Sequence, residues 1–454
     1  MEITRFAPSP TGNLHLGGAR TALFSYLFAK ANNGKFLLRF EDTDKERSKD
    51  EFVKSITDSL NWMKIPPDEE PVFQSKKTAF HKELALQLYK EGLAYACDCT
   101  EERLSKLREE QRLKKQKPMY DGLNRNKNLP LSETSVLRFK FPQEGSSEFD
   151  DLILGNIKIN NKEFDDFIIL RSDGSPTYNF SAAVDDMDMG ITTVIRGDDH
   201  ITNTLKQINI LKALNVKIPS YAHLPMVLGD SGKRLSKRDG AEDILEYKNK
   251  GYLQEALINY LVRLGWTHGE EEIFSLDQLK EIFKLSDVNS SPAKFSLDLL
   301  NWYNNKYLNF IEPQDLIQKV KAITGVDFND MQKGELAVSL IAKGANSVRE
   351  IIDESKYFFQ DPLTDFEELG LDNDRKDLFK SFFKELSKID FDPETIEEFI
   401  KSFIKTNNLK FPELGKPLRI ILTGKQNAPS ITELLYIIGK ELSLQRIEYT
   451  LNHG

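Results

Sequence analysis

The sequence predicts an α/β protein in which a parallel sheet is interrupted by an α+β insertion and followed by an all-helical C-terminal region. Strand-length apolar segments alternate with helical ones up to Glu91 and again from Thr192, which is the rhythm of a parallel α/β sheet. From Gly251 onward apolar residues recur at helical spacing, and no strand-length alternation stands out between Trp302 and Gly454.

The first half of the expected sheet begins with a short strand. Ile3 to Ala7 is mostly apolar and runs into Pro8 and Pro10, which hold the backbone extended. A helix is expected from Ala19 to Ala31, where apolar residues lie at helical spacing, and Asn33-Gly34 is a typical helix end. The next expected elements are a strand over 35–40 and helices over 50–63 and 79–91.

Residues 93–191 break this rhythm and are expected to form the α+β insertion. It should hold a charged helix from Glu101 to Lys117, a polar loop, and short strands over 135–141, 157–159 and 167–170. The acids within Val184–Gly190 are not spaced as in a calcium loop, so a loop with structural or nucleic-acid contacts is expected there.

The second half of the sheet resumes after this insertion. It is expected to contain a strand over 192–196, a helix over 202–214 and an apolar strand over 223–228.

The composition describes a soluble globular protein of two to four domains. The chain has 454 residues, of which 39% are hydrophobic and 29% charged. No apolar run approaches the roughly 20 residues needed to span a bilayer, and the N-terminus lacks the layout of a secretory signal. Cys97 and Cys99 are the only cysteines, which fits a reducing cytoplasm. The net charge of −9 argues weakly against a duplex-DNA binder but does not exclude another nucleic acid bound by a local basic face.

The turn after the first strand carries residues suited to a nucleotide. His15, Gly17 and Gly18 stand where a strand turns into the N-terminus of a helix, and the free N–H groups and helix dipole there favour phosphate. The glycines allow a base or sugar to touch the backbone, and an imidazole can donate a hydrogen bond to phosphate oxygens during displacement. The alternative is a tight turn that only needs small residues.

A second loop, 229–240, is the other candidate for phosphate chemistry. Lys233, Arg234, Lys237 and Arg238 place four cations within six positions, after an apolar strand and between glycines. Such a loop can close over a pyrophosphate and stabilise its charge. The alternative is a solvated basic turn, which is the usual role of such clusters.

The stretch Pro8-Ser9-Pro10-Thr11-Gly12-Asn13-Leu14-His15-Leu16-Gly17-Gly18 resembles the nucleotide-binding signature of class I aminoacyl-tRNA synthetases, and in detail that of the bacterial glutamyl-tRNA synthetases. The related glutaminyl enzymes usually carry a histidine where Gly18 stands and a glutamate where Ser9 stands. The second loop is similar to the lysine–serine–lysine loop of the same class, with Arg234 where lysine is commoner. The resemblance covers nearly the whole chain and implies a Rossmann-type catalytic fold with a helical anticodon-binding region.

The resemblance also implies an ATP-dependent ligase that works in two steps. Glutamate and ATP form glutamyl-adenylate and pyrophosphate once tRNA is bound, and the glutamyl group then passes to the 3′ end of tRNA(Glu). Mg²⁺ accompanies ATP. The implied catalytic residues are His15 and Lys237, and the implied ATP-binding residues are Gly17, Gly18, Arg234, Ser236 and Lys237.

A pocket for glutamate needs at least one arginine and one acid, because the substrate has two carboxylates and one ammonium. Arg196 and Glu41 stand at the ends of expected strands, where open α/β sheets bind ligands. By the resemblance, Arg196 grips the side-chain carboxylate and Glu41 the ammonium. The implied glutamate-contacting residues are Arg5, Ala7, Ser9, Glu41, Tyr178 and Arg196. The alternative for each charged residue is an ordinary surface ion pair.

Zinc is not expected. Some members of the family bind structural zinc with Cys-x-Cys and a later Cys-x-His pair, and Cys97 and Cys99 match the first pair. Asn124 and Asn126 stand where the second pair would be, and two thiolates alone do not complete a tetrahedral site.

The resemblance divides the chain into segments with separate roles. The implied segments are two halves of the Rossmann catalytic domain at 1–95 and 191–250, an acceptor-stem-binding insertion at 96–190, a stem-contact helical region at 251–310 and a helical anticodon-binding region at 311–454. The basic helix of the insertion would meet acceptor-stem phosphates, or would simply be solvated.

The choice of tRNA is expected to be relaxed. Discriminating members of the family read the third anticodon base with an arginine, and Gly344 stands near that position, so charging of tRNA(Gln) as well as tRNA(Glu) is expected. A monomer is expected. Two other classes stay open, a catalytically silent tRNA-binding paralogue and another ATP-dependent nucleotidyltransferase.

Overall fold

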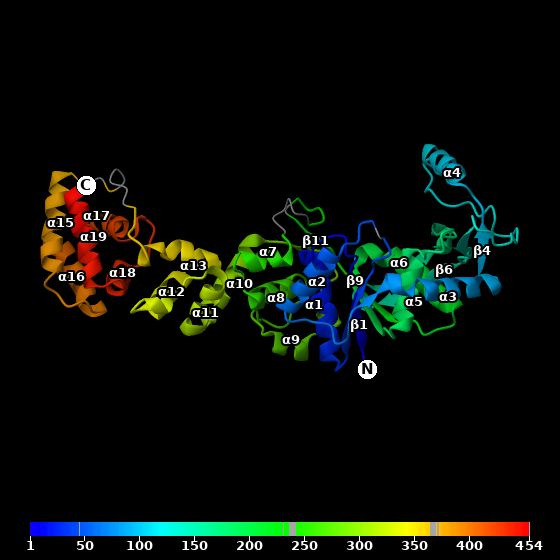
Figure 1. Ribbon diagram of the computed structural model, residues 1–454, viewed down its shortest axis with the longest axis horizontal. Coiled ribbons are helices and arrows are strands. Elements are labelled where there is room, and N and C mark those ends of the chain that lie inside the picture. The colour runs from blue at the N-terminus through cyan, green and yellow to red at the C-terminus, as the bar shows by residue number, and fades with distance from the viewer. Residues whose placement is uncertain (45, 230, 236–241, 364–368, 370–371, 454) are drawn as a thin grey trace. The chain divides into compact units, whose positions relative to one another are not determined.

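The computed structural model describes the chain except for residues 45, 230, 236–241, 364–368, 370, 371 and 454 (Figure 1). The chain forms two compact units, one of Met1–Tyr247 with Leu257–Leu297 and one of Lys248–Ala256 with Asp298–Gly454. Across the described residues, no helix has both the length and the apolar character that a membrane span requires.

The first unit is built on a parallel sheet. Its strands are β1 (Ile3–Phe6), β2 (Lys35–Phe40), β3 (Val72–Phe73), β9 (Thr193–Gly197) and β10 (Ser220–Leu224). β1 pairs with β2 and β2 with β3, while β9 pairs with β10, all in parallel. The backbone N–H of Thr192 donates to the carbonyl of Ile3 at 2.9 Å, which places β9 beside β1. The strand order therefore reverses between β1 and β9, and open α/β sheets bind ligands at the carboxyl ends of strands at such a point.

Helices of the first unit connect and cover these strands. They are α1 (Leu16–Ala31), α2 (Asp50–Trp62), α3 (Thr78–Lys90), α5 (Tyr178–Asp188), α6 (Ile201–Ala213) and α9 (Leu276–Ile282), and α7 (Ile244–Asn249) and α8 (Gln254–Arg263) lie where the two units meet in sequence. α1 ends as expected, since Asn33 adopts a positive φ of 51° and the N–H of Gly34 returns to the carbonyl of Ala29.

The insertion contains two small antiparallel arrangements. β4 (Ala94–Cys97), β5 (Val136–Phe139) and β8 (Ile168–Leu170) form one sheet, and β6 (Ser146–Asp151) and β7 (Gly155–Asn160) form a hairpin that meets β10 where Asp151 lies opposite Tyr221. The charged helix α4 (Glu101–Leu113) buries no side chain and ends before the expected Lys117, because Lys115 turns to a left-handed φ of 54°.

Two expectations for this unit were wrong. Residues 184–190 do not form a loop but the end of α5 and its C-terminal turn, because Phe180, Ala183 and Val184 recur at helical spacing and pack into the core. The apolar segment 223–228 is not one strand: β10 ends at Leu224, Pro225 and Met226 interrupt it, and β11 (Val227–Leu228) pairs with β12 (Ala293–Lys294).

The second unit is helical throughout its described part, as the sequence predicts. Its helices are α10 (Leu297–Phe310), α11 (Pro313–Thr324), α12 (Gly334–Ala342), α13 (Val348–Ser355), α15 (Asn373–Leu386), α16 (Pro393–Thr406), α17 (Phe411–Thr423), α18 (Ile431–Ile438) and α19 (Lys440–His453) (Figure 1). Pro313 and Pro393 each stand at the first position of a helix, where the missing N–H costs no hydrogen bond.

Candidate active site

A cavity of about 730 Å³ opens at the carboxyl ends of β1, β2 and β9. The turn from residue 5 to residue 18 forms one wall of it, and residues 195–197, 199, 200 and 224–227 line it from the ends of β9 and β10 and the segments that follow them. The structure brings together every described residue that the sequence predicts for the site. The cavity-lining members of that set are Arg5, Ala7, Ser9, His15, Gly17, Gly18, Glu41, Tyr178, Arg196 and Arg234.

His15 caps α1 and offers a hydrogen-bond donor to the cavity. Its backbone is extended, and Nδ1 accepts the backbone N–H of Gly18 at 3.2 Å. Because Nδ1 accepts, the ring proton lies on Nε2 in the neutral imidazole. Removal from bulk water, and then the charge of Arg234, lower the pKa of His15 below its ordinary value. The neutral ring can therefore donate to a phosphate oxygen next to the free N–H groups of the helix.

The glycines of this turn have close neighbours. A Cβ at Gly17 would lie 3.3 Å from two atoms of the His15 ring, and a Cβ at Gly18 would lie 3.0 Å from the side chain of Leu14. A side chain at Gly17 would push against the ring that faces the cavity, and one at Gly18 would push against Leu14. Small residues are thus required here for the site as well as for the turn.

The second loop reaches the same cavity at both of its described ends. Arg234 pairs with Asp199, with 3.2 Å between Nη1 and Oδ2, and the N–H of Leu235 donates to the carbonyl of Val227. After the loop, Asp243 accepts from Asn13 at 2.8 Å and the N–H of Ile244 donates to Leu14. Ser236 and Lys237, the other predicted ATP-binding residues, lie outside the described residues.

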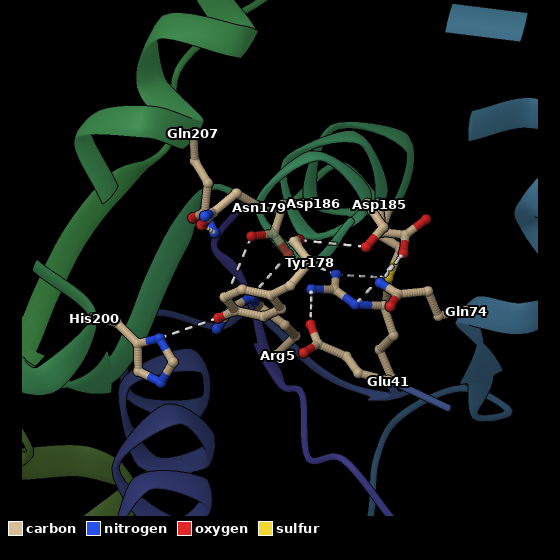
Figure 2. Close-up of polar contacts among 12 residues, drawn as sticks. Arg5, Glu41, Gln74, Tyr178, Asn179, Asp185, Asp186, His200 and Gln207 are labelled. Atoms are coloured by element: carbon tan, nitrogen blue, oxygen red, sulfur yellow. Dashed lines mark hydrogen bonds and ion pairs between the residues drawn. The ribbon is translucent and has the colours of Figure 1, made fainter. Parts of the chain in front are cut away.

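Arg5 and Glu41, which line the cavity, belong to a buried group of charges on β1, β2 and α5 (Figure 2). Arg5 donates to both oxygens of Asp186, and Nη1 of Arg39 donates to Oδ1 of the same carboxylate at 2.6 Å. Nη2 of Arg39 donates to Glu41 at 3.1 Å. Although burial alone would raise it, these arginines lower the pKa of Asp186 to about 2. Burial raises the pKa of Glu41 in spite of Arg39.

The charge group continues away from the cavity into the protein. Asp185 accepts from Gln74 and from the Nε2 atom of His81, each at 2.7 Å, and its carboxylate lies 3.9 Å from Arg39. The side chains of Arg39, Asp185 and His81 are fully buried. Arg39 bonds Glu41 directly and bonds Asp186, which in turn bonds Arg5. The side chains of Arg5 and Glu41 are therefore held in place by the protein itself.

Arg196 differs from Arg5 in its partners. The residue is 7% exposed, and its guanidinium donates from Nη2 to Thr204 at 2.6 Å and forms no ion pair with a described carboxylate. Burial lowers the pKa of Arg196, which remains charged at neutral pH. A buried cation without an acidic partner in a cavity calls for an anionic ligand. Tyr178 closes this side, with its hydroxyl 3.1 Å from Nδ1 of His200 (Figure 2).

Sequence reasoning did not identify Arg39, Asp186, Thr204 or His223 as parts of the site. A signal for Arg39 was present, since it is the one charged residue inside the otherwise apolar stretch Phe36–Phe40, and a charge in a fully buried strand needs partners. The others lie on helices and strands far apart in sequence, and only the fold brings them together.

Cys97 and Cys99 lie in a separate cluster in the insertion. Cys97 lies 3.5 Å and Cys99 3.7 Å from the hydroxyl of Tyr120, and Cys99 lies 3.4 Å from the side-chain oxygen of Asn124. Arg138 donates to Cys97 at 3.4 Å. Within the part of the chain that the structure describes, no three His, Cys, Asp or Glu side chains are grouped so that they could hold a metal ion.

Fold and site together define a class I nucleotide-binding catalytic domain joined to a helical region. Residues 3–302 match the family of class I tRNA synthetases (E and Q), catalytic domain, and residues 301–451 match an anticodon binding domain. The chain therefore belongs to the class I tRNA synthetases of the E and Q group, and is an aminoacyl-tRNA synthetase.

Curated relatives match over the whole length. The glutamate–tRNA ligase of Nitrosomonas eutropha is 46% identical, and the match covers 100% of this chain and 99% of that relative. The glutamate–tRNA ligase of Nitrosomonas europaea is also 46% identical, and the match covers 98% of each chain. A solved glutamate tRNA ligase from Elizabethkingia meningosepticum, in complex with its amino acid, has a TM-score of 0.89 and 32% identity over 99% of both chains. The glutamate-tRNA synthetase of Elizabethkingia anophelis has a TM-score of 0.86, also at 32% identity.

Proposed function

We propose that this protein is a glutamate–tRNA ligase that activates L-glutamate with ATP and transfers the glutamyl group to the 3′ end of tRNA(Glu). The observation that carries the proposal is that a buried Arg196 without an acidic partner among the described residues and the carboxylate of Glu41 line the same cavity as the His15 turn. Full-length relatives named glutamate–tRNA ligases support the same assignment.

Glutamate is held by opposite charges at two ends of the cavity. The charge of Arg5 is neutralised by Asp186, so of these two arginines Arg196 is the one that takes the side-chain carboxylate. Glu41 takes the ammonium. Ala7, Ser9 and Tyr178 complete the contacts from the walls that they line.

Adenylate formation then rests on positioning and charge stabilisation. The glutamate carboxylate attacks the α-phosphorus of ATP, and the bond to the β,γ-pyrophosphate breaks. His15 donates to the phosphates, Gly17 and Gly18 present the N-terminus of α1, and Arg234, Ser236 and Lys237 hold the departing pyrophosphate. Mg²⁺ enters with ATP, where phosphate oxygens and water supply most of its ligands.

The remaining segments serve tRNA. We assign residues 1–95 and 191–250 to the catalytic domain, 96–190 to acceptor-stem binding, 251–310 to stem contact and 311–454 to the anticodon. The basic residues of the largely exposed α4 fit phosphate contacts. We expect the protein to act as a monomer in the cytoplasm. We also expect it to hold no zinc, because Asn124 occupies the position next to Cys99 where a third metal ligand would be needed. Stoichiometric zinc in the purified protein would contradict this.

Relaxed tRNA choice follows from Gly344. This glycine is exposed after α12 and a side chain built on it would meet no described atom within 4 Å, so the position offers no group that reads a base. We propose that tRNA(Gln) is charged with glutamate as well. Charging of purified tRNA(Gln) by the wild-type protein, and its loss in Gly344→Arg, is the expected result; no charging of tRNA(Gln) under conditions that charge tRNA(Glu) would contradict it.

The test of the main proposal is ATP–pyrophosphate exchange in the presence of glutamate, ATP and tRNA. The expected exchange requires all three components and is not supported by glutamine in place of glutamate. A catalytically silent tRNA-binding protein would show no exchange with any amino acid, and another nucleotidyltransferase would not depend on tRNA.

A further inference from the structure

Arg196 is held by neutral groups on the side that faces the protein. Nη2 donates to the hydroxyl of Thr204, from α6, at 2.6 Å, and Nε lies 3.4 Å from Nε2 of His223, from β10. The guanidinium also lies 5.7 Å from the ring centre of Tyr221. These contacts use two of the three guanidinium nitrogens, so Nη1 is the nitrogen left for a ligand in the cavity that Arg196 lines.

His223 is fixed in one orientation by Asp151. The carboxylate of Asp151 lies 2.6 Å from Nδ1 of His223 and 3.0 Å from its backbone N–H, and both side chains are fully buried. A carboxylate only accepts hydrogen bonds, so Nδ1 carries the proton. Burial lowers the pKa of His223 in spite of Asp151, and the ring is neutral at physiological pH. Nε2 is therefore an acceptor that faces Arg196 and the hydroxyl of Thr204, which lies 2.8 Å away.

A continuous chain of donors and acceptors follows from these tautomers. Asp151 accepts from His223, and the bare Nε2 of His223 accepts from the hydroxyl of Thr204. That hydroxyl, which also lies 3.2 Å from the carbonyl oxygen of His200, accepts from Nη2 of Arg196. Thr204, His223 and Asp151 are not among the described residues that line the cavity. Any effect that they have on a ligand must therefore pass through Arg196.

We propose that Asp151, His223 and Thr204 are positioning residues that set the preference for glutamate over glutamine, an inference that rests on the proposed function. They orient a donor-only group, the guanidinium, toward the end of the substrate side chain. A carboxylate offers two acceptor oxygens and a compensating charge to this group. A carboxamide offers one acceptor oxygen and no charge, and its NH₂ group is a donor for which the guanidinium has no acceptor. Loss of the orientation weakens binding of glutamate and narrows the difference between the two amino acids.

The first test compares Thr204→Val with Thr204→Ser, because valine removes the hydroxyl at nearly constant shape and serine keeps it. The measurement is tRNA-dependent exchange with glutamate and with glutamine. For T204V we expect KM for glutamate to rise about 10- to 100-fold, the usual effect of losing a hydrogen bond to a charged group, and the kcat/KM ratio of glutamate to glutamine to fall. KM for ATP should not change, and T204S should stay within about threefold of wild type.

Three results would overturn the proposal: an unchanged KM for glutamate in T204V, equal effects of valine and serine, or an equal rise in KM for ATP. If wild type itself shows no glutamate-dependent exchange, the proposed function fails instead. A wild type that activates glutamate and a T204V variant that matches it reject only the positioning role.

A second pair of variants keeps the proposal testable if T204V does not fold. In His223→Gln the amide oxygen can accept where Nε2 accepted, and in His223→Asn the shorter amide can donate to Asp151 but does not reach Thr204 or Arg196. We expect the KM for glutamate to be lower in H223Q than in H223N. The opposite order, or equal values, would count against an acceptor role for Nε2.

Discussion

Arg5 and Asp186, 181 positions apart, meet in a two-pronged ion pair, with Nε to Oδ1 at 2.9 Å and Nη2 to Oδ2 at 3.2 Å. The pair joins β1 to α5 beneath the cavity, and Arg39 of β2 bonds the same carboxylate. One carboxylate thus holds three elements of the catalytic unit together. The charge of Arg5 is therefore neutralised by Asp186. Arg196, in contrast, has no carboxylate partner among the described residues.

The first prediction concerns Asp186→Asn, which keeps the shape of the side chain and removes its charge. Arg5 and Arg39 would be left with an uncompensated buried charge, so we expect the free energy of unfolding to fall by about 3–5 kcal/mol. Urea unfolding measures the change. The control is Asp58→Asn, which breaks an exposed i,i+4 pair with Lys54 and should cost no more than about 0.5 kcal/mol. An equal decrease in the free energy of unfolding in the two variants would show that the buried ion pair stabilises the protein no more than the exposed one.

The second prediction concerns Arg196→Lys, which keeps the positive charge but loses the planar donor fork. We expect KM for glutamate to rise about 100-fold or more, because a buried charge pair with the ligand loses its second hydrogen bond and its geometry. KM for ATP is the internal control and should change by less than about twofold. Exchange kinetics at varied glutamate would settle it; a wild-type KM in R196K would place the side-chain carboxylate elsewhere.

The third prediction separates two roles of His15. Asn is a good N-cap, so His15→Asn keeps the bond from Gly18 and loses the Nε2 donor, whereas His15→Ala loses both. We expect exchange to fall about 10²-fold in both variants, as for a lost transition-state donor. Stability should fall by about 1 kcal/mol in H15A alone. A nearly active H15N would mean that His15 serves only as a cap.

Most of the fold was predictable from the sequence, because the apolar residues of its strands and helices recur at regular spacing and the ends of these elements carry clear signals. The strand from Ile3, the helix closed by Asn33-Gly34 and the helical C-terminal region were all predicted. The helix at 178–188 was not, because its three acids drew attention to charge rather than to the apolar residues between them. Two of those acids, Asp185 and Asp186, are buried beside arginines that come from β1 and β2, while the third, Asp188, is exposed.

The candidate site was predictable only where a motif stands on one turn. His15, Gly17 and Gly18 are neighbours in sequence, and so are Arg234 and Lys237. Asp186, Thr204 and His223 act through partners 8 to 181 positions away, and no local pattern reports such a contact. Long-range polar contacts need the register of β9 and β10 and the packing of α5 and α6 before they can be seen.

The fourth prediction is a loss of stability on mild acidification. Burial lowers the pKa of His223, which faces Asp151 and Arg196, so below the unfolded-state value of 6.5 the unfolded chain binds a proton that the folded chain resists. Stability therefore falls as pH decreases from 6.5 toward the folded pKa. Urea unfolding at pH 7.5 and 5.5 should show this fall in wild type and a smaller fall in His223→Gln. Identical falls in both proteins would assign the effect to other groups.

The most direct measurement compares Lys237→Ala with Lys233→Ala in glutamate- and tRNA-dependent ATP–pyrophosphate exchange. Both remove one lysine from the same loop, but only Lys237 is assigned to the ATP phosphates. The account predicts that K237A lowers the exchange rate by about 10²-fold or more, while K233A stays close to wild type. A K237A protein that exchanges pyrophosphate at the wild-type rate would contradict the claim that the His15 turn and the second loop act together on ATP.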